Sequence, residues 1–227
     1  MATRTRRAER REEPLSRERI VEAAIGLLDA AGEGGFTFRA LAERLSTGPG
    51  AIYWHVAGKD ELLGAATDAV LAATVADGAG DATPQEAIRT LALGVFDAIE
   101  AHPWIGAQLA RAPAQSSMLR VFERLGRQVQ ALGVPDAAQF TAVSALQNYI
   151  FGVGRQNAAD AQAYRAHRPD TSRAEFLDAV AATWENLDPE EYAFTRTVAD
   201  RLRDHDDRIE YLAGIDFILG GITARRG

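Results

Sequence analysis

Residues 37–63 read TFRALAERLSTGPGAIYWHVAGKDELL, and this stretch specifies the fold of the N-terminal part of the chain. Apolar residues at helical spacing predict the inner face of a first helix: Leu41, Ala42 and Leu45. Ser46-Thr47-Gly48 interrupts that helix, and Pro49 is tolerated only in the first turn of a new one. This second helix is short, from Pro49 to about His55, and a third begins at Lys59. Two short helices joined by a tight turn predict a helix-turn-helix, whose second helix enters the DNA major groove.

The motif residues follow a fixed order: Phe36-Thr37-Phe38-Arg39, Leu41-Ala42, Leu45, Ile52-Tyr53-Trp54-His55-Val56, Lys59 and Leu62-Leu63. In order and spacing, without a gap, they closely resemble the DNA-binding domain of the tetracycline-repressor (TetR) family of bacterial transcription regulators. The resemblance covers about residues 15–65 and implies a transcription regulator. The turn is one departure, because it reads Ser46-Thr47-Gly48 where many relatives carry a Gly-Val-Ser-like sequence.

The rest of the chain has only helical patterns, so we expect an all-α protein. Ser16 predicts the start of a helix that ends at Gly32, and capping boxes predict further starts. The expected helices span about 59–77, 84–101, 104–109, 116–132, 136–161 and 207–223, with further starts at 172–175 and 188–191, a loop at 78–81 and a polar loop at 162–171. We expect a disordered basic arm at 1–14, a DNA-binding domain at 15–62 and a C-terminal helical domain for ligand binding and dimerisation at 63–227.

Charge is distributed unevenly along the 227 residues, whose net charge is -7. Residues 1–60 carry 10 basic and 9 acidic side chains, and the remainder carries 15 and 23. Five arginines lie between residues 4 and 11, where a solvated tail and an arm that reaches DNA phosphates are both open alternatives. The chain has no cysteine, no apolar run long enough to cross a bilayer and no signal-peptide core, which favours the cytoplasm.

Four residues of the first two motif helices are candidate DNA contacts. Arg39 is either a solvated surface arginine or, as the resemblance implies, a reader of a guanine edge. Thr37 combines a helix cap with a phosphate contact. Gly50 and Ala51 present almost no side chain, which permits close backbone approach and a contact between the Ala51 methyl and a thymine methyl.

The end of the second motif helix adds four more candidates. Tyr53, Trp54 and His55 are consecutive and large, so they cannot all face inward on a helix. We assign Tyr53 and His55 to phosphate or base-edge contacts and leave Trp54 open between groove contact and packing. Lys59 stands at a helix N-terminus, where its ammonium and the backbone N–H groups predict a phosphate clamp.

The C-terminal helices predict an inducer pocket with apolar walls and one amide. Its candidate residues are Phe96, Trp104, Met118, Phe122, Gln147 and Phe151. Such a pocket suits a mainly hydrophobic small molecule that carries a hydrogen-bonding group. The alternative is a filled core in which Gln147 is bonded to a neighbouring carbonyl. The sequence predicts no cofactor and no metal site, since the four histidines are scattered.

The preferred hypothesis is a ligand-responsive repressor that binds a palindromic double-stranded DNA operator as a homodimer. One short recognition helix makes few contacts, so we expect two half-sites on a two-fold dimer. The expected dimer helices are 136–161 and 207–223, with small residues Ala213 and Gly220-Gly221 at the contact. The alternative is a constitutive DNA-binding regulator whose C-terminal domain only dimerises. An enzyme is disfavoured, because His205-Asp206-Asp207 is more simply a helix cap with charges.

Overall fold

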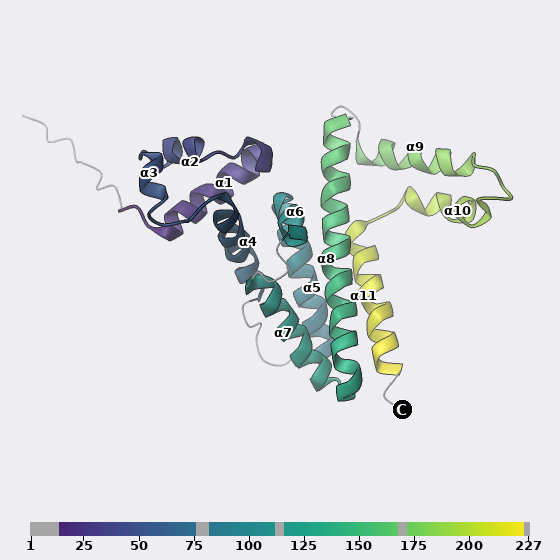
Figure 1. The fold of residues 1–227 in the computed structure, drawn as a ribbon. Coiled ribbons are helices and arrows are strands. Elements are labelled where there is room, and N and C mark those ends of the chain that lie inside the picture. The colour runs from purple at the N-terminus through teal and green to yellow at the C-terminus, as the bar shows by residue number, and fades with distance from the viewer. Residues whose placement is uncertain (1–13, 76–81, 112–115, 168–171, 225–227) are drawn as a thin grey trace, which may run out of the picture. The chain divides into compact units, whose positions relative to one another are not determined.

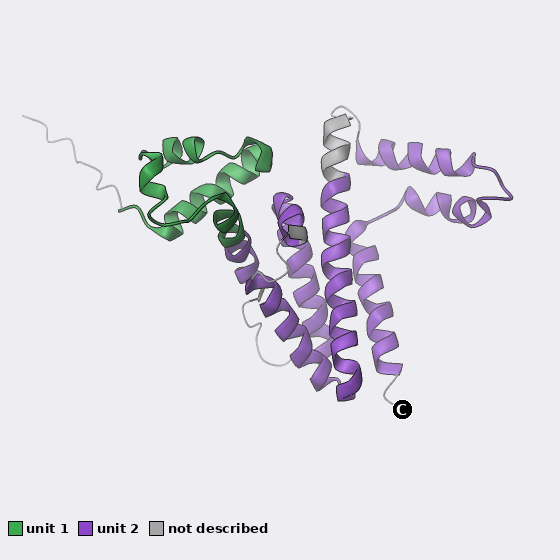
Figure 2. Ribbon diagram, viewed as in Figure 1, with its two compact units in different colours: residues 1–66 green, residues 67–227 purple. Residues whose placement is uncertain are grey.

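The computed structural model describes residues 14–75, 82–111, 116–167 and 172–224, and every regular element in these ranges is helical (Figure 1). The all-α prediction is therefore confirmed. The chain divides into two compact units, residues 1–66 and 67–227 (Figure 2). No helix within the described ranges has the length and apolar character needed to span a membrane. Residues 1–13 of the predicted arm and the whole predicted loop at 78–81 lie outside the described residues.

The first unit contains α1 (Arg17–Gly35), α2 (Phe38–Arg44), α3 (Pro49–Ile52) and the beginning of α4 (Lys59–Val75). As predicted, Ser16 caps α1, and its hydroxyl accepts a hydrogen bond from the Arg19 N–H. Gly32 has a φ of 64°, so the chain kinks at the predicted helix end before a last turn to Gly35. The core of the unit consists of fully or nearly fully buried apolar residues: Ile20, Ala24, Leu28, Phe36, Leu41, Ala42, Ile52, Val56, Leu62 and Leu63.

The turn between α2 and α3 has the tight geometry of the motif. Ser46 has a φ of 53°, a left-handed conformation that costs a residue with a Cβ about 1–2 kcal/mol. The Thr47 N–H donates to the Ala42 carbonyl at 2.9 Å, which closes the turn. The regular helix α3 ends at Ile52 rather than at His55, because the N–H groups of His55 and Val56 both donate to the Ile52 carbonyl. This bonding tightens the last turn.

The second unit is built on a bundle of long helices (Figure 1). Four of them pack side by side: α5 (Pro84–Ala101), α7 (Ser116–Ala131), α8 (Asp136–His167) and α11 (Asp207–Ala224). The shorter α6 (Trp104–Arg111) lies against α8. The buried stripes match the predicted helical spacing: Ile88, Leu91, Val95 and Ile99 on α5; Val121, Leu125 and Val129 on α7; Leu146 and Ile150 on α8; Ile215 and Leu219 on α11.

Two predictions about this unit are wrong. The polar loop expected at 162–171 is helical from residue 162 to His167, because Gln, Ala and Arg favour helix and the first breaker in that sequence is Pro169. Residues 168–171 of this loop lie outside the described residues. The start signal at 188–191 forms a turn, in which the Asp188 carboxylate accepts the N–H groups of Glu190 and Glu191. The helix α10 (Ala193–Val198) begins only afterwards and continues into the 3₁₀-helix η1 (Ala199–Leu202), and both pack on α9 (Arg173–Glu185).

Tyr211 of α11 ties three helices of the bundle together. Its buried hydroxyl donates to the Ala92 carbonyl of α5 at 3.0 Å, and burial raises the pKa of this phenol. The ring lies 4.9 Å from that of Phe96 and is stacked on that of Tyr149 at 5.7 Å. The Tyr149 hydroxyl in turn donates to the Tyr211 carbonyl at 3.2 Å, directly over Gly214. The two tyrosines therefore join α5, α8 and α11 in one contact.

Replacement of Gly214 should break this contact. A Cβ at this position would lie 1.9 Å from the Tyr149 hydroxyl oxygen, so the tyrosine would have to leave its place. We expect Gly214→Ala to destabilise the protein by about 1–3 kcal/mol despite the better helix propensity of alanine. The measurement is the midpoint of urea unfolding, followed by helical circular dichroism.

Gly126→Ala on α7 is the matched control. A Cβ there meets no heavy atom within 4 Å, so the substitution should stabilise the protein by about 0.5–1 kcal/mol. An unchanged or raised midpoint for Gly214→Ala would show that the packing of Tyr149 over α11 contributes nothing to stability.

Candidate functional site

The start of α2 presents two of the predicted DNA-contacting residues. Thr37 caps the helix, as predicted, and its hydroxyl accepts the Ala40 N–H at 3.1 Å. Arg39 lies on the exposed side of the helix, where its Nε is 3.0 Å from Oε1 of Glu43. The Arg39 side chain is 86% exposed, and an exposed pair of this kind contributes little free energy. The guanidinium can therefore exchange this partner for another acceptor at low cost.

The end of α3 carries an aromatic pair and an exposed indole. The ring of Tyr53 stacks on that of Phe38, with centroids 4.7 Å apart and planes 4° apart. Trp54 is 90% exposed and makes no side-chain hydrogen bond or ring contact with the other described residues. Phe38 was not among the predicted site residues, although its place directly after the cap of α2 brings its side chain under the end of α3. The stack fixes Tyr53 and leaves Trp54 outside the core.

The remaining motif candidates differ in exposure. Gly50 is exposed, and a Cβ built on it would meet open space. Ala51 and His55 are half-buried. Backbone at the first turn of α3 is consequently accessible from outside, which is the condition that close approach to a nucleic acid requires.

Lys59 has an internal partner that the sequence did not indicate. Its ammonium donates to the Glu33 carbonyl at 3.2 Å and lies 5.8 Å from the centroid of the Phe36 ring. The first turn of α4 is capped by Glu61, whose carboxylate accepts the Ala57 N–H and pairs with Arg17 at 2.6 Å. The hydrogen bond from Ala57 is the main cause that lowers the pKa of Glu61. Lys59 is thus at a helix N-terminus, as predicted, but it also connects α4 to the end of α1.

The first unit therefore gathers donors, an exposed indole and accessible backbone around α3. Its candidate residues are Thr37, Arg39, Gly50, Ala51, Tyr53, Trp54, His55 and Lys59. Guanidinium, hydroxyl, indole and ammonium groups donate hydrogen bonds, which suits phosphate oxygens and the acceptors of base edges. In the described part of the chain, no cluster of three or more His, Asp or Glu residues could hold a metal ion.

The six predicted ligand-binding residues differ in burial. Phe96, Trp104 and Phe151 are buried, whereas Met118, Phe122 and Gln147 are half-buried. Only Phe96 lines one of the two cavities described below. The Gln147 amide donates to the Met118 carbonyl at 3.2 Å, which is the arrangement expected for the filled-core alternative.

The start of α7, where Met118 lies, is held from two sides. Asp68 of α4 accepts the Ser117 N–H at 2.9 Å and the Ser116 hydroxyl. Burial opposes the charged form of Asp68, but the hydrogen bonds from Ser116 and Ser117 prevail and lower its pKa. Gln147 of α8 holds the following turn through the Met118 carbonyl. These polar contacts connect α4, α7 and α8 within the second unit.

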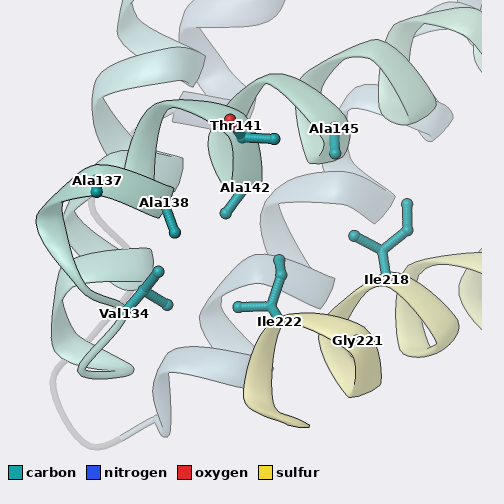
Figure 3. Close-up of a pocket in the computed structure, with 9 residues that line it drawn as sticks. All are labelled: Val134, Ala137, Ala138, Thr141, Ala142, Ala145, Ile218, Gly221 and Ile222. Atoms are coloured by element: carbon teal, nitrogen blue, oxygen red, sulfur yellow. The ribbon is translucent and has the colours of Figure 1, made fainter. Parts of the chain in front are cut away.

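Two of the cavities in the second unit are lined entirely by described residues. The first, of about 420 Å³, is an open groove between the start of α8 and the end of α11 (Figure 3). Small and aliphatic side chains line it: Val134, Ala137, Ala138, Thr141, Ala142, Ala145, Ile218, Gly221 and Ile222. The second, of about 120 Å³, lies between the end of α5, the middle of α8 and the beginnings of α9 and α11. Of the residues in these linings, only Phe96 was among the predicted ligand-binding residues, because each lining combines residues that are distant in the chain.

The comparisons with known proteins agree with the geometry. A family model described as "Bacterial regulatory proteins, tetR family" matches residues 20–66, and one described as "Tetracyclin repressor-like, C-terminal domain" matches residues 77–226. The HTH-type transcriptional repressor DrrR1 of Streptomyces coeruleorubidus is 30% identical over 165 residues. That match covers 71% of this chain and 60% of DrrR1, which is less than two thirds of the relative.

Solved structures match over nearly the whole chain. The transcriptional regulator SCO7222, a TetR from Streptomyces coelicolor, is 58% identical, with a TM-score of 0.83 over 94% of this chain and 100% of that chain. ActR of the same organism, solved in complex with actinorhodin, has the same fold at 23% identity, with a TM-score of 0.76 over 95% and 100% of the two chains. The chain thus belongs to the tetR family of bacterial regulatory proteins, whose members are transcriptional regulators and not enzymes.

Proposed function

We propose that this protein is a cytoplasmic, ligand-responsive repressor that binds a palindromic DNA operator as a homodimer. The main evidence for DNA binding is the group of exposed side chains around α3. Trp54 is 90% exposed and Tyr53 is 54% exposed, although both are large and apolar enough to be buried in an ordinary core. Exposed aromatic side chains in the same motif as Arg39 and Lys59 are suited to a partner that offers phosphates and base edges. The name of DrrR1, an HTH-type repressor, supports the same function.

The homodimer is supported by the groove between α8 and α11 and by exposed apolar side chains on the same two helices. Phe217 is 83% exposed and Phe140 is 74% exposed, on α11 and α8 respectively. Small residues along the groove would let a second pair of helices approach closely, and Gly220 and Gly221 leave open space where a Cβ would stand. The occupant that fits best is the same pair of helices from a second copy, which would bury both faces at once.

The effector is proposed as a mainly hydrophobic small molecule that binds in the second unit. ActR, which has the same fold, is seen with actinorhodin bound, so the fold is able to hold a small molecule. The predicted pocket around Trp104, Met118, Phe122 and Phe151 stays a proposal. The bond between Gln147 and the Met118 carbonyl favours the filled-core alternative for that part of the domain. A thermal-shift screen of ligands, followed by a test of whether each hit releases the protein from its operator, distinguishes a ligand-responsive repressor from a constitutive regulator.

Arg39 and Lys59 should affect DNA binding in different ways. We expect Arg39→Ala to cost roughly 1–3 kcal/mol per half-site and to relax specificity at one base position, because a base contact is lost. Lys59→Ala should weaken binding to all DNA sequences equally, because a phosphate contact is lost. The slope of log affinity against log salt concentration should become shallower by about 1. The measurement is selection of bound DNA from a random pool, followed by titrations at several salt concentrations.

Arg127→Ala is the matched control for this experiment. Arg127 on α7 forms the same kind of exposed pair, with its Nε 3.0 Å from Oε1 of Glu123, and lies outside the first unit. It should leave affinity and specificity unchanged. If Arg39→Ala and Lys59→Ala both weaken binding to all DNA sequences equally, the assignment of Arg39 to a base contact and Lys59 to a phosphate contact is wrong.

A charge on the exposed face of α11 should separate the subunits. We expect Phe217→Glu to give a monomer at micromolar concentration that keeps its helical content but loses operator binding, because an unpaired carboxylate would be buried in the interface. Leu119→Glu on α7, where the leucine is 59% exposed and outside the groove, is the control and should remain a dimer. Sedimentation velocity is the measurement, and a monomeric wild type would exclude the proposed dimer.

A further inference from the structure

The cavity of about 120 Å³ in the second unit has the size of a small ligand. An engineered protein cavity of about 150 Å³ binds benzene, so the space corresponds to roughly one six-membered ring. It lies where the end of α5 meets the middle of α8 and the first turns of α9 and α11. Residues far apart in the chain close it: Phe96 and Glu100 come from α5, Asn157 from α8 and Asp207 from α11.

One wall of the cavity is apolar and fixed. Phe96 is 6% exposed, and its ring is held against Tyr211, whose hydroxyl is bonded to the Ala92 carbonyl. Ile99 lies beside it, close to Gly154 of α8, where a Cβ would stand only 2.6 Å from the Ile99 Cδ1. Ala158, the next small residue along α8, completes the apolar side. A flat ring placed there would contact an aromatic face and aliphatic carbons.

The polar side contains groups with partners and groups without them. Asp207 is satisfied, because one oxygen is 2.6 Å from the Arg173 guanidinium and the other is 2.9 Å from Nε2 of His205. Asn157 and Glu100, in contrast, make no side-chain hydrogen bond with any described residue. Arg208 attracts Glu100 only through space, since its own hydrogen bond goes to Asp97. One half-buried amide and one exposed carboxylate at the cavity therefore have no hydrogen bond to another described residue.

The charges at the cavity favour a positively charged ligand over a negatively charged one. Its lining carries two carboxylates and one guanidinium. The guanidinium of Arg173 is already paired with Asp207, so the charge in excess is the negative charge of Glu100. An anionic ligand would have to displace Asp207 from Arg173 and would also be repelled by Glu100. A cation meets an unpaired carboxylate and, on Asn157, an amide oxygen that accepts a hydrogen bond.

We infer that this cavity binds a small aromatic amine. The ring lies against Phe96 and Ile99, and the ammonium donates to Glu100 and to the Asn157 amide oxygen. That such an amine also acts as the effector rests on the proposed function, since it presupposes operator binding. The assignment narrows the mainly hydrophobic effector to one ring with a positively charged group.

The test compares three probes that share a ring and differ in their polar end. The probes are 2-phenylethylammonium, 2-phenylethanol and 3-phenylpropionate, titrated by calorimetry or ligand-observed NMR into the full-length protein without DNA. We expect the ammonium probe to bind about tenfold tighter than the alcohol, which is the effect of one hydrogen bond to a charged group. The carboxylate probe should bind most weakly. Tighter binding of the carboxylate than of the amine would overturn the inference.

Three variants locate the binding. Glu100→Gln should remove the preference for the amine over the alcohol, and Asn157→Ala should weaken binding of the amine. Ala158→Leu should abolish binding of both probes, because the larger side chain fills the cavity. Asn157 and Glu100 have no internal hydrogen bond to lose, so their variants should melt within about 2 °C of the wild type.

Gln156→Ala is the matched control for these variants. Gln156 directly precedes Asn157 on α8, but its amide is exposed and lies outside the cavity lining. Its truncation should therefore change neither the affinity for the amine nor that for the alcohol. Amine binding that survives both Glu100→Gln and Ala158→Leu would overturn the inference.

A second experiment tests whether amine binding in the cavity also changes operator binding. Saturating amine should lower operator affinity in the wild type and leave Ala158→Leu unaffected. Because the titrations contain no DNA, they remain decisive even if the protein proves not to bind an operator. Amine that binds in the cavity without changing operator affinity would overturn the effector role and leave the assignment of the site supported.

Discussion

The contact between Tyr211 and Tyr149 is the constraint that holds the helices of the second unit in register. It requires a glycine at 214, because the Tyr149 hydroxyl occupies the space of a Cβ there. Through the Ala92 carbonyl it fixes α11 to α5, and through the stacked ring it fixes α11 to α8. The same Tyr211 ring supports Phe96, the wall of the small cavity. This tyrosine cluster therefore joins the two helices that form the groove and supports one wall of the candidate ligand site.

The first unit uses several residues for folding and for exposed chemistry together. Thr37 caps α2, Lys59 bonds the Glu33 carbonyl, and Tyr53 stacks on Phe38, so each of the three is held in place before any partner arrives. Groups fixed in this way lose little conformational entropy when they bind. Arg39 and Trp54 are different, since neither contributes to the core of the unit. We interpret the first group as positioning and the second as the part of the surface with most freedom to adapt.

Polar contacts link the helices of the second unit in a way that a purely apolar core would not. Asp68 of α4 and Gln147 of α8 both hold the beginning of α7. Asp68 accepts the Ser117 N–H and the Ser116 hydroxyl, and the Gln147 amide donates to the Met118 carbonyl. A displacement of α7 would therefore break hydrogen bonds to two other helices at once.

The helices, the turn and the family could be inferred from the sequence alone. Local signals suffice for these, because capping residues, Pro49 and helical spacing act within a few positions of each other, and they indicated α2 and the starts of α5 and α9 correctly. The end of α8 was misjudged, since polar residues 162–167 can form helix as readily as loop. The identity of the carbonyl that Gln147 bonds, the partner of Lys59 and the lining of the two cavities emerged only when the helices were packed together. Each of these depends on which side chains meet across helices, and helical spacing specifies a face but not the residues that will lie opposite it.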